Sequence, residues 1–273
     1  MVIDTKMERQ KIKCELYHDN FQNYKRYNIP KAQLVIADIP YNTGNNAYAS
    51  NPMWYEGGDL ANGESKFANK VFFDSDVSFN IYEYFHFCSK LLKPEPKEVG
   101  KAPAMIIFCA YEQQDMLIKE AKRLGFNGYI PISFIKNYSP QVLKANMRIV
   151  GATEYAIVFY RQKLPKFNNK GKMVFDWFKY ESDSKQIPKI HPTQKPVKIL
   201  KRLIEIFTDE GDVVIDPVAG SGTTLRAAYE LNRNSYGFEK NKEFYRKAKE
   251  QMLTGLTVDE LEKKEIGYIS LFD

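Results

Sequence analysis

Two glycines follow an acidic residue at a point where a predicted strand ends and a ligand could bind. Residues 212–216 predict a buried strand that stops at Asp216, and Gly220 and Gly222 lie in a turn before a predicted helix. In open α/β sheets, ligands bind beyond the carboxyl ends of the strands, and glycines let the backbone approach them closely. Asp216 could there accept hydrogen bonds from a ligand ammonium. The alternative is a tight turn that needs glycine for its backbone alone.

The next predicted strand carries a second acid with suitable chemistry. Glu239 follows residues 235–238, and a carboxylate at a strand end can accept hydrogen bonds from both hydroxyls of a ribose. The turn lacks the lysine of a GxxxxGK[ST] loop, which argues against a phosphate cradle. Upstream, Thr193 and Lys195 precede a helix expected to begin near Pro196, and their hydroxyl and ammonium could hold a carboxylate. Lys195 could instead be an ordinary surface lysine at a helix start.

A third acid ends the strand expected at residues 33–37. Asp38 is followed by Ile39, Pro40 and Tyr41, and the proline restricts the backbone of the turn. Asp38 can accept hydrogen bonds, and the ring of Tyr41 offers a face on which a base can stack. Taken alone, the four residues also suit a strand end followed by a simple turn.

Three segments, in this order, resemble the motifs of DNA adenine-N6 methyltransferases of the β arrangement, in which the catalytic motif precedes the cofactor motifs. Residues 38–41 (DIPY) resemble that family's DPPY, residues 191–196 have its sequence HPTQKP, and residues 216–224 (DPVAGSGTT) resemble its DPFAGSGTT. Residues 135–140 and 16–19 resemble two weaker family elements, near the flipped base and the cofactor adenine respectively. The resemblance covers residues 14 to 250 or so, which is most of the chain.

The resemblance implies an α/β, Rossmann-like fold of the S-adenosylmethionine-dependent methyltransferases. We expect a mostly parallel seven-stranded sheet with helices on both faces and a small basic insertion. The implied function is site-specific transfer of a methyl group from S-adenosylmethionine to the N6 amine of a flipped adenine in double-stranded DNA.

The resemblance also assigns roles to residues. Asp38 and the carbonyl of Ile39 would accept the two N–H bonds of the amine, so that its lone pair points at the sulfonium methyl. Pro40 would stiffen this turn and Tyr41 would stack on the base. The expected cofactor-binding residues are Asp19, Thr193, Lys195, Asp216, Val218, Gly220, Gly222, Thr223 and Glu239.

Two positions depart from the family pattern. Ile39 stands where the first proline is usual, and Val218 stands where phenylalanine is usual. A backbone carbonyl does not require proline, so Ile39 should be tolerated, whereas the smaller Val218 should reduce cofactor affinity.

Asp38 favours adenine, because related cytosine-N4 enzymes usually have serine there. A cytosine-N4 methyltransferase and a catalytically inactive DNA-binding relative are the alternatives.

The elements that must position these residues alternate between strands and helices, which predicts a mostly parallel α/β sheet. The length of the chain suits one methyltransferase domain over residues 1–273. Strands are expected at 33–37, 104–110, 129–135, 155–160, 212–216 and 235–238, and helices at 111–125, 223–232 and 240–252.

Two long segments interrupt this alternation. Residues 42–70 are rich in Asn and Gly and are expected to form a mobile loop near the site. Residues 161–190 carry a surplus of five positive charges with aromatic residues among them, which favours a DNA-contacting, target-recognition insertion over a merely solvated one. The expected DNA-binding residues are Asn42, Trp54, Lys136, Asn137, Lys163, Lys166, Lys170, Lys172, Trp177 and Lys179.

Composition argues against several other classes of protein. The formal net charge of +6 suits a polyanionic partner, no apolar run is long enough for a membrane span, and no signal peptide is evident. We therefore expect a cytoplasmic protein of a bacterial or phage-infected cell. The three histidines form no metal-ligand pattern, so no metal site is expected.

The tail, residues 267–273, contains ISLF, which resembles peptides that dock on the bacterial replication sliding clamp. Tyr268 stands where glutamine is usual in such peptides. The alternative is a tail docked on the protein's own surface. The sequence predicts neither the recognition sequence nor the oligomeric state.

Overall fold

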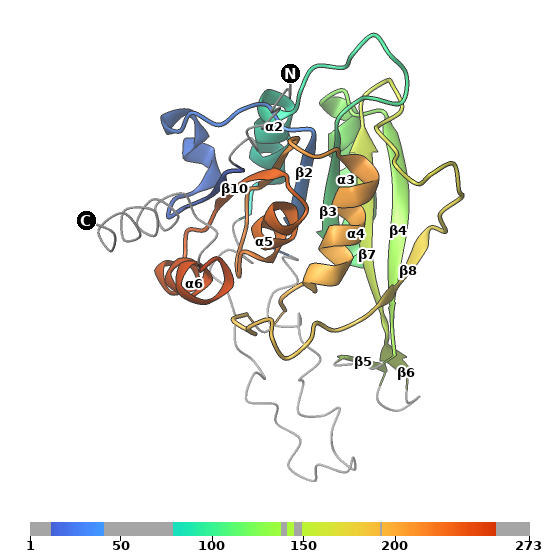
Figure 1. Ribbon diagram of the computed structural model, residues 1–273. Coiled ribbons are helices and arrows are strands. Elements are labelled where there is room, and N and C mark those ends of the chain that lie inside the picture. The colour runs from blue at the N-terminus through green and yellow to red at the C-terminus, as the bar shows by residue number, and fades with distance from the viewer. Residues whose placement is uncertain (1–11, 41–78, 138–140, 145–148, 192, 255–273) are drawn as a thin grey trace, which may run out of the picture.

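An eight-stranded sheet forms the centre of the computed structural model (Figure 1), which describes residues 12–40, 79–137, 141–144, 149–191 and 193–254. In spatial order its strands are β1 (Cys14–Tyr17), β10 (Asn234–Phe238), β9 (Val213–Asp216), β2 (Leu34–Asp38), β3 (Ala104–Cys109), β7 (Thr153–Tyr160), β4 (Gly128–Lys136) and β8 (Trp177–Tyr180). Neighbouring strands are parallel except where β7 pairs with β3 and β4. The expectation of a mostly parallel α/β sheet is confirmed.

The sheet has one strand more than the seven expected. Part of the basic insertion forms β8, which pairs in parallel with β4 at the edge of the sheet. A separate two-stranded sheet, β5 (Gln141–Lys144) with β6 (Ile149–Gly151), follows β4 in the chain.

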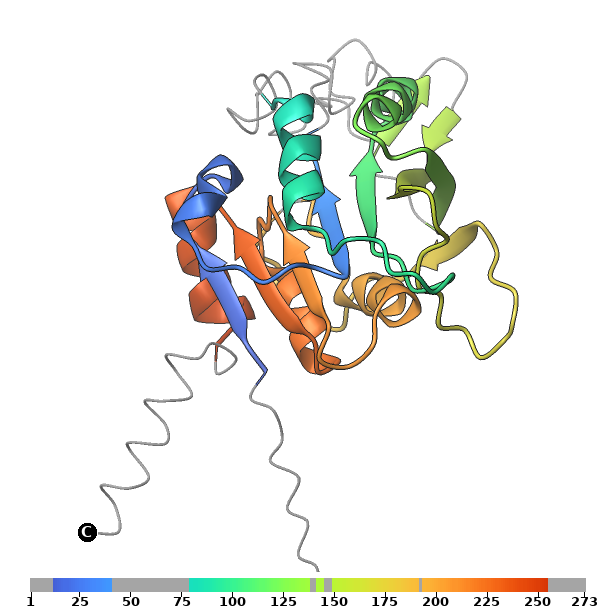
Figure 2. The same cartoon turned by 90° about the horizontal axis from the view of Figure 1, so that it is seen from above.

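Helices cover both faces of the sheet (Figure 2), as expected from the alternation in the sequence. One face carries α2 (Ile81–Leu91) and α3 (Gln114–Arg123), and the other carries α4 (Val197–Phe207) and α5 (Thr223–Glu230). The expected helix at 240–252 consists of α6 (Lys242–Lys247) and a π-helical turn, Ala248–Met252. The expected helix at 111–125 begins as a short 3-10 turn, η4 (Tyr111–Gln113), before α3.

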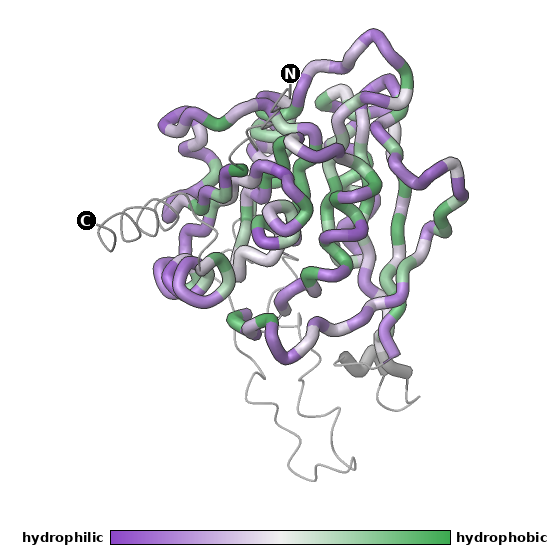
Figure 3. The backbone as a smooth tube through the Cα atoms, in the orientation of Figure 1, coloured by the Kyte–Doolittle hydropathy of each residue, from purple (hydrophilic) through white to green (hydrophobic). Residues whose placement is uncertain are grey.

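The hydrophobic core has two layers because successive side chains of a strand point to opposite faces. Val35 and Ala37 of β2 pack on the α2 side, whereas Leu34 and Ile36 pack on the α4 side. Hydrophobic residues concentrate along these central strands (Figure 3). The strands are therefore held rigidly between helices, and the residues at their ends are fixed in place.

Parallel pairing brings the functional candidates to one edge of the sheet. We call the carboxyl edge the one formed by the last residues of the parallel strands together with the first residues of β7. Asp38 and Asp216 end β2 and β9, and Glu239 and Asp19 lie just beyond β10 and β1. The opposite edge is called the amino edge.

Several expectations lie outside the described residues. They are Tyr41, Asn42, Trp54, the loop at 42–70 and the tail at 267–273. In the described part of the chain, no helix is both long enough and apolar enough to cross a membrane.

Candidate active site

Asp38 lies at the end of β2 in contact with a buried lysine. Its Oδ2 atom is 2.7 Å from Nζ of Lys195, whose side chain is 7% exposed against 30% for Asp38. The Lys195 ammonium also lies 5.2 Å from the centroid of the Phe108 ring. Sequence reasoning placed Lys195 on a cofactor carboxylate, and the structure places it on the predicted catalytic acid.

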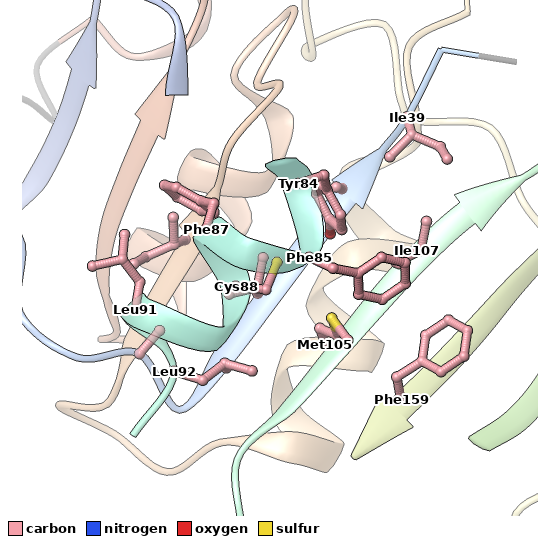
Figure 4. Close-up of a cluster of buried hydrophobic side chains, with 14 of the residues drawn as sticks. Ile39, Tyr84, Phe85, Phe87, Cys88, Leu91, Leu92, Met105, Ile107 and Phe159 are labelled. Atoms are coloured by element: carbon pink, nitrogen blue, oxygen red, sulfur yellow. The ribbon is translucent and has the colours of Figure 1, made fainter. Parts of the chain in front are cut away.

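The turn after Asp38 is anchored on both sides. The Ile39 side chain is buried in the hydrophobic core close to Tyr84 and Ile107 (Figure 4). The Pro40 carbonyl accepts a hydrogen bond of 3.1 Å from Nε2 of Gln113. Isoleucine in place of proline therefore gains core packing, which supports the expectation that this departure is tolerated.

A second acid, which sequence reasoning missed, completes the surroundings of Lys195. Glu154 of β7 lies 3.3 Å from the Lys195 ammonium and forms an ion pair with Lys136 at the end of β4. Burial alone would raise the pKa of Glu154, but the two ammonium groups outweigh it and hold that pKa below its ordinary value. An acid in an otherwise apolar strand was the only signal in the sequence.

Asp216 is a buried carboxyl group beside a glycine turn. It is 4% exposed, its Oδ1 accepts a hydrogen bond of 3.0 Å from the Val218 amide, and burial raises its pKa to about 7. Gly220 and Gly222 have φ values of 51° and 78°, which side chains rarely adopt. Backbone conformation therefore requires glycine at both positions of the predicted motif, as the tight-turn interpretation proposed.

Glu239 is tied to the same turn from the neighbouring strand. Its two carboxylate oxygens accept hydrogen bonds from the amides of Gly220 (2.9 Å) and Asn241 (2.6 Å). Burial raises the pKa of Glu239 to about 6. The structure thus brings Asp216, Val218, Gly220 and Glu239 together at the carboxyl ends of β9 and β10.

Asp19 lies beyond β1 and is held by its own loop. Its carboxylate accepts hydrogen bonds from the Asn20 amide (2.7 Å), the Asn23 side chain (2.6 Å) and the Tyr27 hydroxyl (2.9 Å). The hydrogen bond from Asn23 is the main reason why the pKa of Asp19 is lowered. Asp19 is therefore an ionised acceptor in a fixed position, and its contact with a cofactor adenine stays a prediction.

Thr193 precedes Lys195 in the segment before α4. Its Oγ1 atom lies 3.0 Å from Nδ1 of His191, and the His191 ring packs on Phe244 at a centroid distance of 4.6 Å. Burial, followed by the charge of Lys195, lowers the pKa of His191 to about 4. A neutral His191 therefore positions the Thr193 hydroxyl, whereas Thr223 is buried at the start of α5.

The basic residues expected to contact DNA do not share one surface. Lys166 is buried near the amino edge, with its ammonium 2.6 Å from Asp209 and 2.8 Å from Asp212. Lys163 donates hydrogen bonds to the carbonyls of Pro96 and Lys97. These contacts argue against DNA binding by Lys163 and Lys166.

Of three more expected DNA-binding residues, two lie toward the amino edge and the third is paired inside the candidate site. Lys170 and Lys172 flank a turn whose neighbours Asn168 and Asn169 bind residues in the second half of α4, which runs toward the amino edge. Lys136 is 10% exposed and paired with Glu154. Of the described set, only Trp177 and Lys179 on β8, and Asn137 directly after β4, are both exposed and on the segments that lead to the carboxyl edge.

Known proteins are similar to this chain in sequence and in fold. The family model described as DNA methylase matches residues 32–250. The chain is 34% identical over 139 residues to the DNA adenine methyltransferase YhdJ of Escherichia coli (strain K12), over 49% of this chain and 42% of that protein. It is 39% identical over 101 residues to the type II methyltransferase M2.LlaDCHI of Lactococcus lactis subsp. cremoris, over 36% of this chain and 38% of that protein. The chain thus spans less than two thirds of either relative.

Two solved structures share the fold at low sequence identity. The crystal structure of the M1.HpyAVI–SAM complex has a TM-score of 0.62 at 23% identity, over 88% of this chain and 99% of that chain. The PvuII DNA methyltransferase (cytosine-N4-specific) has a TM-score of 0.59 at 16% identity, over 91% of this chain and 89% of that chain. Since the family model covers most of the sequence, including all three motif segments, this chain belongs to the DNA methylase family.

Proposed function

We propose that this protein transfers a methyl group from S-adenosylmethionine to the N6 amine of adenine in double-stranded DNA. The observation that carries the proposal is the Asp38 carboxylate, held by Lys195 at the carboxyl edge and adjacent in the sheet to the acid-lined ends of β9 and β10. Membership of the DNA methylase family supports a methyl transfer to DNA. The name of the relative YhdJ, an adenine methyltransferase, and the acid at position 38 favour adenine.

The residues at the ends of β9, β10 and β1 fit S-adenosylmethionine. Asp216 and Glu239 offer carboxylate acceptors for an ammonium and for ribose hydroxyls, and the half-buried Val218 offers an apolar surface. Asp19 supplies a third acceptor, Thr193 supplies a hydroxyl, and Lys195 supplies an ammonium beside Asp38. When bound, S-adenosylmethionine supplies an electrophilic methyl group on a sulfonium.

The chain's own residues prepare the amine for attack. An exocyclic amine is a poor nucleophile because its lone pair is delocalised into the ring. Asp38 Oδ and the Ile39 carbonyl accept its two N–H bonds, which favours a tetrahedral nitrogen with a directed lone pair. The Lys195 ammonium holds the Asp38 carboxylate in place, and the core packing of Ile39 keeps the two acceptors in fixed positions.

The same proposal includes a DNA-contacting surface and an interaction tail. We propose Asn137, Trp177 and Lys179 as DNA-binding residues, because they lie toward the edge that carries Asp38. The loop at 42–70 and the clamp-like peptide at 267–273 stay proposals from sequence. A DNA substrate agrees with the expected cytoplasmic location and with the type II methyltransferases among the relatives.

The first test measures transfer of labelled methyl from S-adenosylmethionine to unmethylated genomic DNA, followed by nucleoside analysis. We expect label in N6-methyladenine, and a loss of roughly 100-fold or more in Asp38→Ala, because one of two essential acceptors is removed. Asp209→Ala is the matched control, since Asp209 pairs with the buried Lys166 at 2.6 Å but lies near the amino edge. Label in N4-methylcytosine would overturn the base assignment, and the absence of label would overturn methyl transfer to DNA.

A further inference from the structure

Glu154 occupies a place in the site that the family resemblance does not assign. β7 runs opposite to its neighbours, so its first residues meet the last residues of β3 and β4 at the carboxyl edge. Glu154 is the second residue of β7, and its side chain is 19% exposed. One lysine from β4 and one from the segment before α4 converge on this carboxylate.

Four charged groups form one cluster around Lys195. Asp38 and Glu154 supply two negative charges, and Lys195 and Lys136 supply two positive charges. Lys195 and Lys136 are 7% and 10% exposed, so water compensates little of their charge. Within this set the charges balance while Glu154 is present, and removal of its charge leaves the two buried ammonium groups with one negative charge fewer.

Lys195 lies between the two acids and is shared by them. Its ammonium is 2.7 Å from Asp38 and 3.3 Å from Glu154. An ammonium that loses one of two carboxylates binds the other more tightly, since it must still be compensated. Without Glu154, Lys195 would neutralise Asp38 more fully and weaken it as a hydrogen-bond acceptor.

We propose that Glu154 is a positioning residue: it pairs with the same Lys195 ammonium as Asp38, so that Asp38 can still accept a hydrogen bond from the substrate amine. The proposal rests on the proposed function, because it concerns the same Asp38. Glu154 also offsets the charge of two lysines close to a nitrogen that becomes positive as its bond to the methyl carbon forms. Both effects act on the reacting amine, so they affect turnover more than binding.

The test compares Glu154→Gln with Glu230→Gln, a matched control. Glu230 of α5 also bridges two cations, Lys201 and Arg226, but it lies at the end of its helix away from the carboxyl edge. For Glu154→Gln we expect kcat to fall by about 10-fold or more, with KM for cofactor and DNA within about twofold. We expect Glu154→Asp, which keeps the charge, to recover part of the loss.

The split between turnover and binding separates positioning from general destabilisation. A purely structural loss would act on kcat and on the KM values alike, as expected for any effect of Glu230→Gln, and Glu154→Asp would not reverse it. Unchanged kcat in Glu154→Gln, or a rise in the KM values as large as the fall in kcat, would overturn the proposal.

A second measurement does not depend on activity. Melting temperatures of Glu154→Gln, Asp38→Asn and the double variant test whether the two acids share Lys195. We expect the double variant to lose about 2 °C or more beyond the sum of the single losses, because Lys195 then loses the charges of both of these carboxylates at once. Additive losses would contradict the role of Glu154 even if the wild-type protein methylated no DNA, so the two proposals can fail separately.

Discussion

Asp216 is a carboxyl group that the fold buries. Burial raises its pKa from an ordinary value of 3.8 to about 7, with smaller contributions from the charges of Asp38 and Glu239. Between these pH values the folded protein holds a proton that the unfolded chain has lost. The free energy of unfolding therefore decreases as the pH rises from about 4 to about 7, because the folded state binds more protons than the unfolded state in this range.

Asp216→Asn should remove this penalty while keeping the shape of the side chain. At pH 8 we expect the variant to be more stable than the wild type by on the order of 2–4 kcal/mol, and near pH 4 the difference should vanish. Urea unfolding at both pH values measures the effect. A gain of equal size at pH 4 and pH 8 would show that ionisation of Asp216 is not its cause.

At the scale of single residues, the sequence predicts the acids at strand ends better than it predicts which charged side chains pair with each other. Asp38, Asp216 and Glu239 each follow a short apolar run, and parallel pairing then brings them to one edge. Glu154 could not be assigned in this way, because its partners come from β4 and from the segment before α4. Which ammonium meets which carboxylate depends on packing across the sheet, which spacing along the chain does not give.

At the scale of elements, the start of α4 is fixed from outside the helix. Its N-cap residue, Pro196, has no side-chain oxygen for the first turn. The Asp183 carboxylate, from the basic insertion, accepts hydrogen bonds from the amides of Val197 (3.0 Å) and Lys198 (3.4 Å). Lys195 immediately precedes this turn, so the insertion helps to place a residue of the site.

Asp183→Ala should therefore destabilise the protein by about 0.5–2 kcal/mol, the usual cost of losing a helix cap. Methyl transfer should also fall, since the segment that carries Lys195 loses its anchor. Asp176→Ala is the control, because it removes an acid of the same insertion that does not lie at a helix end. Equal unfolding free energies for the two variants would contradict a capping role for Asp183.

The insertion also shows why elements are harder to predict than motifs. In the sequence, its aromatic residues suggest a surface for stacking on bases. In the structure, Trp177–Tyr180 form the edge strand β8 and Tyr180 is buried. Four residues with mixed burial carry little strand signal of their own. Pairing with β4 decides their conformation, and that contact comes from a strand more than 40 residues earlier in the chain.

At the scale of the whole molecule, the two edges of the sheet hold different sets of charged residues. The amino edge holds ion pairs such as those of Lys166 with Asp209 and Asp212, which compensate buried charge. The carboxyl edge collects Asp38, Glu154 and the acids beyond β9 and β10. The net positive charge of the insertion is therefore divided between the edges, and composition alone could not show this division.

This division predicts that lysines of the insertion contribute unequally to DNA binding. Lys179, which pairs in register with Ile135 near the carboxyl edge, should contact a phosphate, whereas Lys172 lies beside the second half of α4. Lys179→Ala should weaken DNA binding by about 3–10-fold and reduce the slope of log affinity against log salt by about 1. Lys172→Ala removes the same charge from the chain, so net charge is matched. Fluorescence anisotropy at several salt concentrations measures both effects. A greater loss of DNA affinity in Lys172→Ala than in Lys179→Ala would place the DNA on the part of the insertion beside α4 instead.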